Sequence, residues 1–161
     1  MEQNKKSILV IDDEEVILDF FQELLSKDGY LVKVAKTGEE GLEAIRGEFF
    51  NLAIVDKNLP GLSGLEVIKR AKKLNPDTEI IIITAYGSLE SVMEAIKLGV
   101  LSYLTKPFED IKKVRENIKK ALERQDSKFA FRKRMEEMAE GNKRLRDLNL
   151  RIESKLKNVE E

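Results

Sequence analysis

The feature that most constrains the fold of this chain is a buried strand that ends in an acid. Residues 52–55, Leu-Ala-Ile-Val, form an unbroken apolar run, and Asp56 closes it. Such runs are typical of strands that are covered on both faces, as in a parallel sheet with helices on either side. Pro60 and Gly61 then force a loop. A carboxylate at the carboxyl end of such a strand lies where ligands bind in open α/β sheets.

Strand and helix patterns alternate five times within the first 125 residues. Strands are predicted at residues 7–11, 31–35, 51–55, 80–83 and 102–105, and each is followed by apolar residues at helical spacing. Two of the helices open with a capping box, a Ser or Thr followed three residues later by Glu, at Thr37 and at Ser63. This alternation predicts an all-parallel, doubly wound α/β sheet with short crossovers.

Composition excludes several function classes. The chain has no cysteine and no histidine, which removes disulfides, zinc–imidazole sites and Ser-His-Asp hydrolysis. The net charge of −1 favours neither nucleic acid nor an anionic membrane as a partner. The apolar runs are too short to span a membrane, and the N-terminus lacks a signal-peptide core. We therefore expect a soluble, cytoplasmic protein that does not bind the membrane.

The last 36 residues, from Asp126, have a different character. They contain no proline and one glycine, and half of them are charged, so a helix continuing from the fifth helix is expected. Apolar side chains recur at strict seven-residue spacing, at Phe131, Met138, Leu145, Ile152 and Val159. The companion positions are poor, namely Arg134, Gly141, Leu148 and Lys155. We favour a dimeric coiled coil with an imperfect seam over an unpaired, solvated helix. Ten basic and eight acidic residues are interspersed here, so direct nucleic-acid binding is not expected.

Four predicted strands end in a reactive polar residue on the same side of the sheet. These residues are Asp12 and Asp13, Asp56, Thr84 and Lys106. Three carboxylates in one crevice repel one another unless a cation joins them, and Mg2+ with its preference for oxygen ligands suits that set. The hydroxyl of Thr84 and the ammonium of Lys106 suit phosphate. The arrangement is that of an Asp acting as a nucleophile on phosphorus and forming an aspartyl phosphate.

Together these residues make residues 7–124 resemble the receiver domain of two-component response regulators. The resemblance is carried by Asp12-Asp13, by Asp56, by Thr84-Ala85 and by Lys106-Pro107. The stretch from Thr84 to Ser88 is most similar to receivers attached to enhancer-binding transcriptional activators. The resemblance implies a flavodoxin-like sheet of order 2-1-3-4-5 with five helices. It also implies a receiver domain at residues 1–124, followed by a helical extension at residues 125–161.

The resemblance further implies a role for each site residue. Asp56 would accept a phosphoryl group from a histidine kinase, which is consistent with a chain that has no histidine. Mg2+, with Mn2+ as a plausible substitute, would be held by Asp12, Asp13, Asp56 and the backbone carbonyl of Asn58. The phosphoryl oxygens would be bound by Thr84, Ala85 and Lys106.

Tyr103 would be the switch aromatic that turns inward when Thr84 moves. Asn58 and Tyr86 occupy positions that tune hydrolysis, and an aromatic Tyr86 predicts slow self-dephosphorylation. Lys57 departs from the family pattern, and its role stays open between kinase contact and phosphoryl lifetime.

The leading hypothesis is thus a signalling module rather than an enzyme that acts on other substrates. We expect phosphorylation to change self-association through the C-terminal helix and through the face formed by the fourth helix, fifth strand and fifth helix. One alternative is a phosphatase with an Asp nucleophile, but Asn58 stands where such enzymes need a general acid. Another is a complete transcription factor, but the sequence has no phosphate loop and no convincing helix-turn-helix. The chain either acts alone or is the receiver fragment of a larger transcriptional activator whose output domain is absent. Asp13, taken alone, could also simply cap the first helix.

Overall fold

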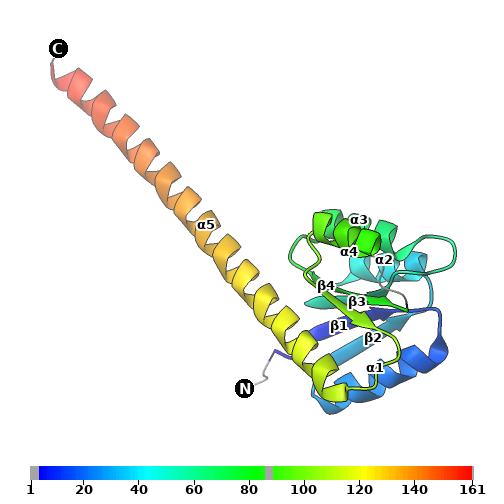
Figure 1. Ribbon diagram of the computed structural model, residues 1–161. Coiled ribbons are helices and arrows are strands. Elements are labelled where there is room, and N and C mark those ends of the chain that lie inside the picture. The colour runs from blue at the N-terminus through cyan, green and yellow to red at the C-terminus, as the bar shows by residue number, and fades with distance from the viewer. Residues whose placement is uncertain (1–3, 86–88, 161) are drawn as a thin grey trace. The chain divides into compact units, whose positions relative to one another are not determined.

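Five parallel strands form the centre of the structure, a computed structural model that describes residues 4–85 and 89–160. They are β1 (Ser7–Ile11), β2 (Leu31–Ala35), β3 (Leu52–Asp56), β4 (Glu79–Thr84) and β5 (Ser102–Thr105). The sheet has the order β2-β1-β3-β4-β5, and every neighbouring pair is parallel (Figure 1). The predicted flavodoxin-like topology is therefore confirmed.

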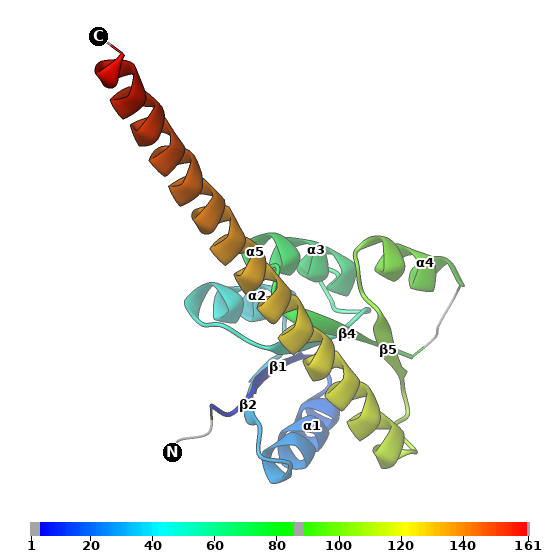
Figure 2. The same cartoon turned by 90° about the vertical axis from the view of Figure 1, so that its left-hand side faces the viewer.

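Helices cover both faces of this sheet. They are α1 (Glu15–Lys27), α2 (Gly38–Gly47), α3 (Gly64–Leu74), α4 (Leu89–Lys97) and α5 (Ile111–Val159). Helix α1 and the first turns of α5 lie on one face, and α2, α3 and α4 lie on the other (Figure 2). This two-sided covering explains why the central strands lack the polar alternation of a half-exposed sheet.

Alternate residues of each central strand feed two separate hydrophobic cores. In β4, Ile80 and Ile82 pack on the side of α2, α3 and α4, whereas Ile81 and Ile83 pack on the side of α1 and α5. The same alternation holds in β1 and β3, because successive side chains of a strand point to opposite faces. All of β3, including Asp56 at its end, is buried.

The starts of α2 and α3 follow local capping rules, and the start of α1 does not. Thr37 accepts a hydrogen bond from the Glu40 backbone N–H at 3.1 Å, and Ser63 caps α3 in the same way, so both predicted N-caps are confirmed. The return half of the first capping box differs, because the Glu40 side chain accepts from the Lys36 backbone N–H. The interpretation of Asp13 as the cap of α1 is wrong. The N-cap is Glu14, without a side-chain hydrogen bond, and the turn is held instead by Asp12 Oδ1, which accepts from the Glu14 backbone N–H at 2.8 Å.

The chain divides into two compact units, Met1–Gln125 and Asp126–Glu161. Helix α5 begins in the first unit and continues without interruption through the second as far as Val159, so the predicted helical extension is confirmed. Gly141 lies within this helix, and a side chain added there would meet open space. Within residues 4–85 and 89–160, no helix is both long and apolar enough to cross a membrane.

Candidate functional site at the carboxyl edge of the sheet

The candidate site is built around Asp56, the last residue of the buried strand β3. Its neighbour β1 runs in register with it, Ile11 opposite Val55, so Asp12 emerges beside Asp56. Both carboxylates are almost completely buried, Asp56 being 3% exposed and Asp12 fully enclosed. Asp13 is exposed at the rim, yet one carboxylate oxygen from each of the three residues lies within 4.8 Å of the others. The predicted carboxylate cluster is thus present in the structure.

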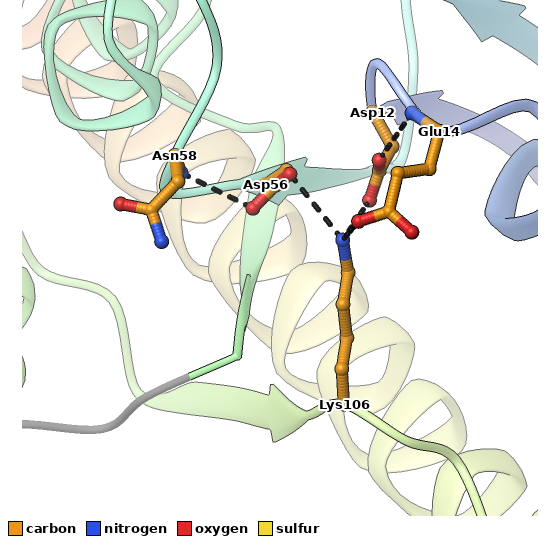
Figure 3. A network of polar contacts seen from close by, with 5 residues as sticks. All are labelled: Asp12, Glu14, Asp56, Asn58 and Lys106. Carbon is orange, nitrogen blue, oxygen red and sulfur yellow. Dashed lines mark hydrogen bonds and ion pairs between the residues drawn. The ribbon is translucent and has the colours of Figure 1, made fainter.

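Lys106 reaches this cluster from the loop that follows β5. Its Nζ lies 3.0 Å from Asp12 Oδ2, 3.4 Å from Asp56 Oδ2 and 2.9 Å from Glu14 Oε1 (Figure 3). The lysine side chain is only 12% exposed, so its charge is largely removed from water. One ammonium therefore contacts three carboxylates and offsets part of the repulsion among them.

Burial and charge act in opposite directions on the two central groups. Burial raises the pKa of Asp12, and the charge of the neighbouring Asp56 raises it further. The Glu14 backbone N–H and the Lys106 ammonium lower this pKa, but the net pKa of Asp12 is raised. For Lys106 burial acts to lower the pKa, but hydrogen bonds to Glu14 and Asp12 and the charge of Asp56 outweigh it, so the net pKa is raised. The lysine is a permanent cation at neutral pH.

The oxygen atoms of the cluster fit a hard divalent cation. Three carboxylates that converge within 4.8 Å form a donor set of oxygens alone, which is the set that Mg2+ and Mn2+ bind. In addition, Asp12 Oδ2 is a buried oxygen that lies 3.0 Å from the Lys106 ammonium, and a carboxylate oxygen has lone pairs for more than one such contact. A buried carboxylate oxygen with spare capacity at the rim of such a set is suited to a metal ligand.

The other predicted site residues surround this centre. Asn58 is exposed, and its backbone N–H donates to Asp56 Oδ1 at 3.1 Å, which holds the carboxylate in one orientation. Thr84 ends β4 next to Asp56, because Ile83 pairs with Asp56 in the sheet, and it is buried. Ala85 follows it and is exposed. Tyr86, and with it the prediction about phosphoryl lifetime, lies outside the described residues.

A second group of predicted residues lies around a cavity next to the acidic cluster. The cavity has a volume of about 90 Å3 and lies between β4, β5 and α4. Thr84, Lys57 and Tyr103 are among its lining residues. The Tyr103 side chain is 52% exposed, so it does not fill the cavity. Lys57 Nζ donates a hydrogen bond to Ser91 Oγ of α4, so this ammonium is directed to the helix.

Sequence reasoning missed two features of the site. Glu14 supplies the shortest contact to Lys106, although it is separated from it by 92 positions in sequence. Gly64 lies so close to the backbone of Asp56 that a Cβ atom there would be 2.0 Å from the Asp56 carbonyl oxygen. The acidic run at residues 12–15 was a signal for the first feature, whereas a single glycine gave none for the second.

The fold and the site define a flavodoxin-like α/β domain with a cluster of acidic residues and one lysine at the carboxyl edge of its sheet. Residues 8–119 match the family model of the response regulator receiver domain. The chain therefore belongs to the response regulator receiver family, as its motifs predicted.

Individual relatives agree with this assignment. The chain is 36% identical to sporulation initiation phosphotransferase F of Bacillus subtilis over 117 residues, which are 73% of this chain and 94% of that protein. It is 37% identical to the transcriptional regulatory protein ZraR of Escherichia coli over 122 residues, but these are 76% of this chain and only 27% of ZraR. The chain thus spans about a quarter of the length of that regulator.

Solved structures show the same likeness. A CheY-like response regulator receiver domain protein from Methanospirillum hungatei has a TM-score of 0.74 and 38% identity, covering 78% of this chain and 99% of that one. The response regulator TrrA of Thermotoga maritima, in complex with Mg2+ and a beryllium fluoride, has a TM-score of 0.65 and 35% identity. This likeness covers 72% of this chain and 98% of TrrA.

Proposed function

We propose that this protein is a phosphorylation-driven switch that accepts a phosphoryl group from a histidine kinase on Asp56. The observation that carries the proposal is the position of the Asp56 carboxylate. It is buried at a strand end, with a lysine ammonium 3.4 Å from one oxygen and two further carboxylates close by. A nucleophile in this setting has its position defined by the surrounding groups before the donor arrives.

The reaction requires one bond to form and one to break. An Asp56 carboxylate oxygen attacks the phosphorus atom, and the bond from phosphorus to the donor nitrogen of a phosphohistidine breaks, the electron pair leaving with that nitrogen. The Asn58 backbone N–H, which donates to Asp56 Oδ1, holds the carboxylate in place. Lys106 and the Thr84 hydroxyl, with the Ala85 backbone, bind the transferred oxygens and offset their charge.

The excess of negative charge at this site suits a divalent cation. Asp12, Asp13, Asp56 and the Asn58 backbone carbonyl would hold Mg2+, or Mn2+ in its place. When bound, the ion supplies positive charge that screens the carboxylates from the incoming phosphate. The proposed protein catalyses only its own phosphotransfer and the slow loss of its own phosphoryl group, and it acts on no other substrate.

The test is incubation with acetyl phosphate and Mg2+, read by intact mass and by peptide mapping. We expect the wild type to gain the mass of one phosphoryl group on residue 56 and Asp56→Asn to gain none. Asp19→Asn, an exposed acid on α1, is the matched control and should label like the wild type. Unchanged mass in the wild type, or label on another residue, refutes the proposal. The rival phosphatase would instead turn over a soluble phosphate ester many times, and we expect no such turnover.

The output of the switch is proposed to be self-association. The phosphoryl group draws Thr84 toward it, and Tyr103 turns into the cavity that both residues line. This changes the α4, β5 and α5 face, where Leu89, Met93 and Tyr103 are exposed in this structure. The C-terminal part of α5 then forms a coiled coil between two copies of the chain.

Sedimentation velocity with and without beryllofluoride tests this output. We expect the activated wild type to shift its association, and a chain that ends at Arg124 to lose the shift while still accepting phosphate. One mass for all these samples contradicts the proposal.

A second candidate is that this sequence corresponds to the receiver part of a larger transcriptional activator. The supporting observation is the 27% coverage of ZraR, whose remaining length has no counterpart here. Both candidates share the chemistry at Asp56 and differ only in what the switch controls.

A further inference from the structure

The last 29 residues of helix α5, residues 131–159, carry a second set of seam positions beside the strict seven-residue series. The first set is Phe131, Met138, Leu145, Ile152 and Val159. The second set is Met135, Asn142, Asn149 and Leu156. Each of these residues follows one member of the first set by four positions and precedes the next member by three. Alternating steps of four and three define the a and d positions of a coiled coil, with the second set at a and the first at d.

This assignment gives a seam with apolar ends and a polar middle. All seven apolar members are between 48% and 82% exposed in the single chain, and Asn142 and Asn149 are exposed as well. The d positions are apolar throughout. The a positions are apolar at both ends and amide at the two central layers. A single helix leaves this whole stripe without a partner, and the stripe extends over four heptads, long enough for a stable two-stranded pairing.

We infer that the C-terminal helices of two copies of this chain pair in parallel and in register, with Asn142 facing Asn142 and Asn149 facing Asn149 across the seam. This inference rests on the proposed dimer and defines its geometry. An asparagine at position a is the residue that selects two strands and one register in parallel coiled coils, because its amide finds a partner only in the same layer.

The other alignments leave amides unpaired. In an antiparallel pair, a positions face d positions of the partner helix, and every d residue here is apolar, so Asn142 and Asn149 are each buried without a hydrogen-bond partner. A parallel pair shifted by one heptad places Asn142 opposite Asn149, but the remaining two asparagines then face Met135 and Leu156. Only the in-register parallel pair satisfies both amide layers.

Flanking charges agree with the parallel alignment. In that alignment the g residue of one helix faces the e residue of the next heptad on the other. The four facing pairs are Arg134 with Ala139, Gly141 with Arg146, Leu148 with Glu153 and Lys155 with Glu160. One pair is oppositely charged and none is alike in charge. Gly141 has no side chain, and a Cβ atom added at this position would meet nothing within 4 Å in the single chain.

Single cysteines test the alignment on the full chain, which has no cysteine of its own. Met135→Cys and Leu156→Cys lie 21 positions apart, or about 32 Å along a helix. With beryllofluoride, in a redox buffer of reduced and oxidised glutathione, we expect each variant to form a disulfide with its own copy. Ser154→Cys, at the outward f position, is the matched control and should stay reduced. An antiparallel pair, in which a positions face d positions, would instead hold the two copies of either cysteine far apart, and neither variant would form a disulfide with its own copy.

The amide layers are tested by replacing both asparagines. The double variant Asn142→Leu with Asn149→Leu should self-associate at least tenfold more tightly than the wild type. It should also form species heavier than a dimer in sedimentation equilibrium. Asn158→Leu, an asparagine outside the seam, is the control and should leave the dimer unchanged. A double variant that stays purely dimeric, or any cross-linking pattern other than self-pairing at both ends, overturns the inference.

These outcomes separate the inference from the proposed function. A dimer in which neither cysteine variant cross-links with its own copy would reject the parallel alignment and keep the dimer. A wild type that stays monomeric with beryllofluoride, together with cysteine variants that do not cross-link, would reject both the alignment and the dimer. Phosphorylation of Asp56 is measured by intact mass on the same variants. Its outcome tests the proposed phosphoacceptor and does not depend on either cross-linking result.

Discussion

Gly64 offers a direct test of how tightly the phosphoacceptor strand is held. It is the first residue of α3, and its N–H donates to the Lys57 carbonyl at 3.1 Å, so the helix begins directly against the end of β3. A Cβ at this position would lie 2.0 Å from the Asp56 carbonyl oxygen and 2.8 Å from the Lys57 Cα. Both contacts are to backbone, which cannot rotate away as a flexible side chain can.

The cost of Gly64→Ala follows from this geometry. The gap between 2.0 Å and the 3.4 Å at which ordinary contacts begin is 1.4 Å, and the start of α3 has to move by about that distance. Forcing a group into a packed site costs about 1–3 kcal/mol, and losing the Gly64–Lys57 hydrogen bond costs about 0.5–1.5 kcal/mol. We expect the free energy of unfolding to fall by about 2–4 kcal/mol. Because this is below the total stability of a typical domain, about 5–15 kcal/mol, the variant should still fold.

Urea unfolding followed by tyrosine fluorescence measures this loss. All three tyrosines lie in the Met1–Gln125 unit, so the signal reports that unit alone. Gly47→Ala is the matched control, because a Cβ there meets nothing within 4 Å and alanine stabilises a helix by up to about 1 kcal/mol. We also expect labelling by acetyl phosphate to slow by roughly tenfold or more in Gly64→Ala, because displacing a reactive group by about 1 Å is that costly.

Equal urea midpoints for Gly64→Ala and Gly47→Ala would show that α3 can retreat from the Asp56 carbonyl at no cost. Reduced stability with an unchanged labelling rate would keep the packing argument and refute the link between this glycine and the reactive carboxylate.

Three further substitutions probe neighbouring contacts. Glu14→Gln removes one of the carboxylates around Lys106, and a partly exposed ion pair of this kind contributes about 0.5–1 kcal/mol. Because the ammonium is then free to bind phosphate, we expect labelling by acetyl phosphate to become roughly two- to fivefold faster. A slower rate would mean that Glu14 assists transfer. Gln125→Ala removes the acceptor of the Asn51 amide at 3.1 Å within a buried contact, and we expect a loss of about 1–3 kcal/mol in urea unfolding. Lys57→Ala removes the hydrogen bond to Ser91 of α4, and we expect amide hydrogen exchange in that helix to become roughly fivefold faster, corresponding to about 1 kcal/mol. Unchanged exchange would show that this hydrogen bond does not stabilise α4.

Much of the site could be predicted because each strand carries its chemistry at its end. Asp12, Asp56 and Lys106 are far apart in sequence, but parallel strands bring their carboxyl ends to one edge of the sheet. The strand order itself could not be derived from local patterns. It came from the resemblance, because hydrophobic periodicity says which residues are buried and not which strands are neighbours.

Local reasoning was wrong where two groups competed for the same turn. Asp13 has the side chain of a capping residue, but Asp12 accepts the Glu14 N–H instead, and the α1 N-cap makes no side-chain bond. Propensity ranks residue types one at a time. It does not show which of two adjacent acids the fold directs inward.

The sequence by itself determined the alternation of strands and helices, the residues at the strand ends and the unbroken helix from Ile111 to Val159, because these depend on spacing along the chain. Only the tertiary structure decided that Glu14 shares the Lys106 ammonium, that Gly64 touches the Asp56 carbonyl and that Tyr103 is exposed beside a cavity. Glu14 and Lys106 are far apart in sequence, whereas Gly64 and Asp56 are only eight positions apart, but all three features depend on how whole elements pack rather than on any local pattern.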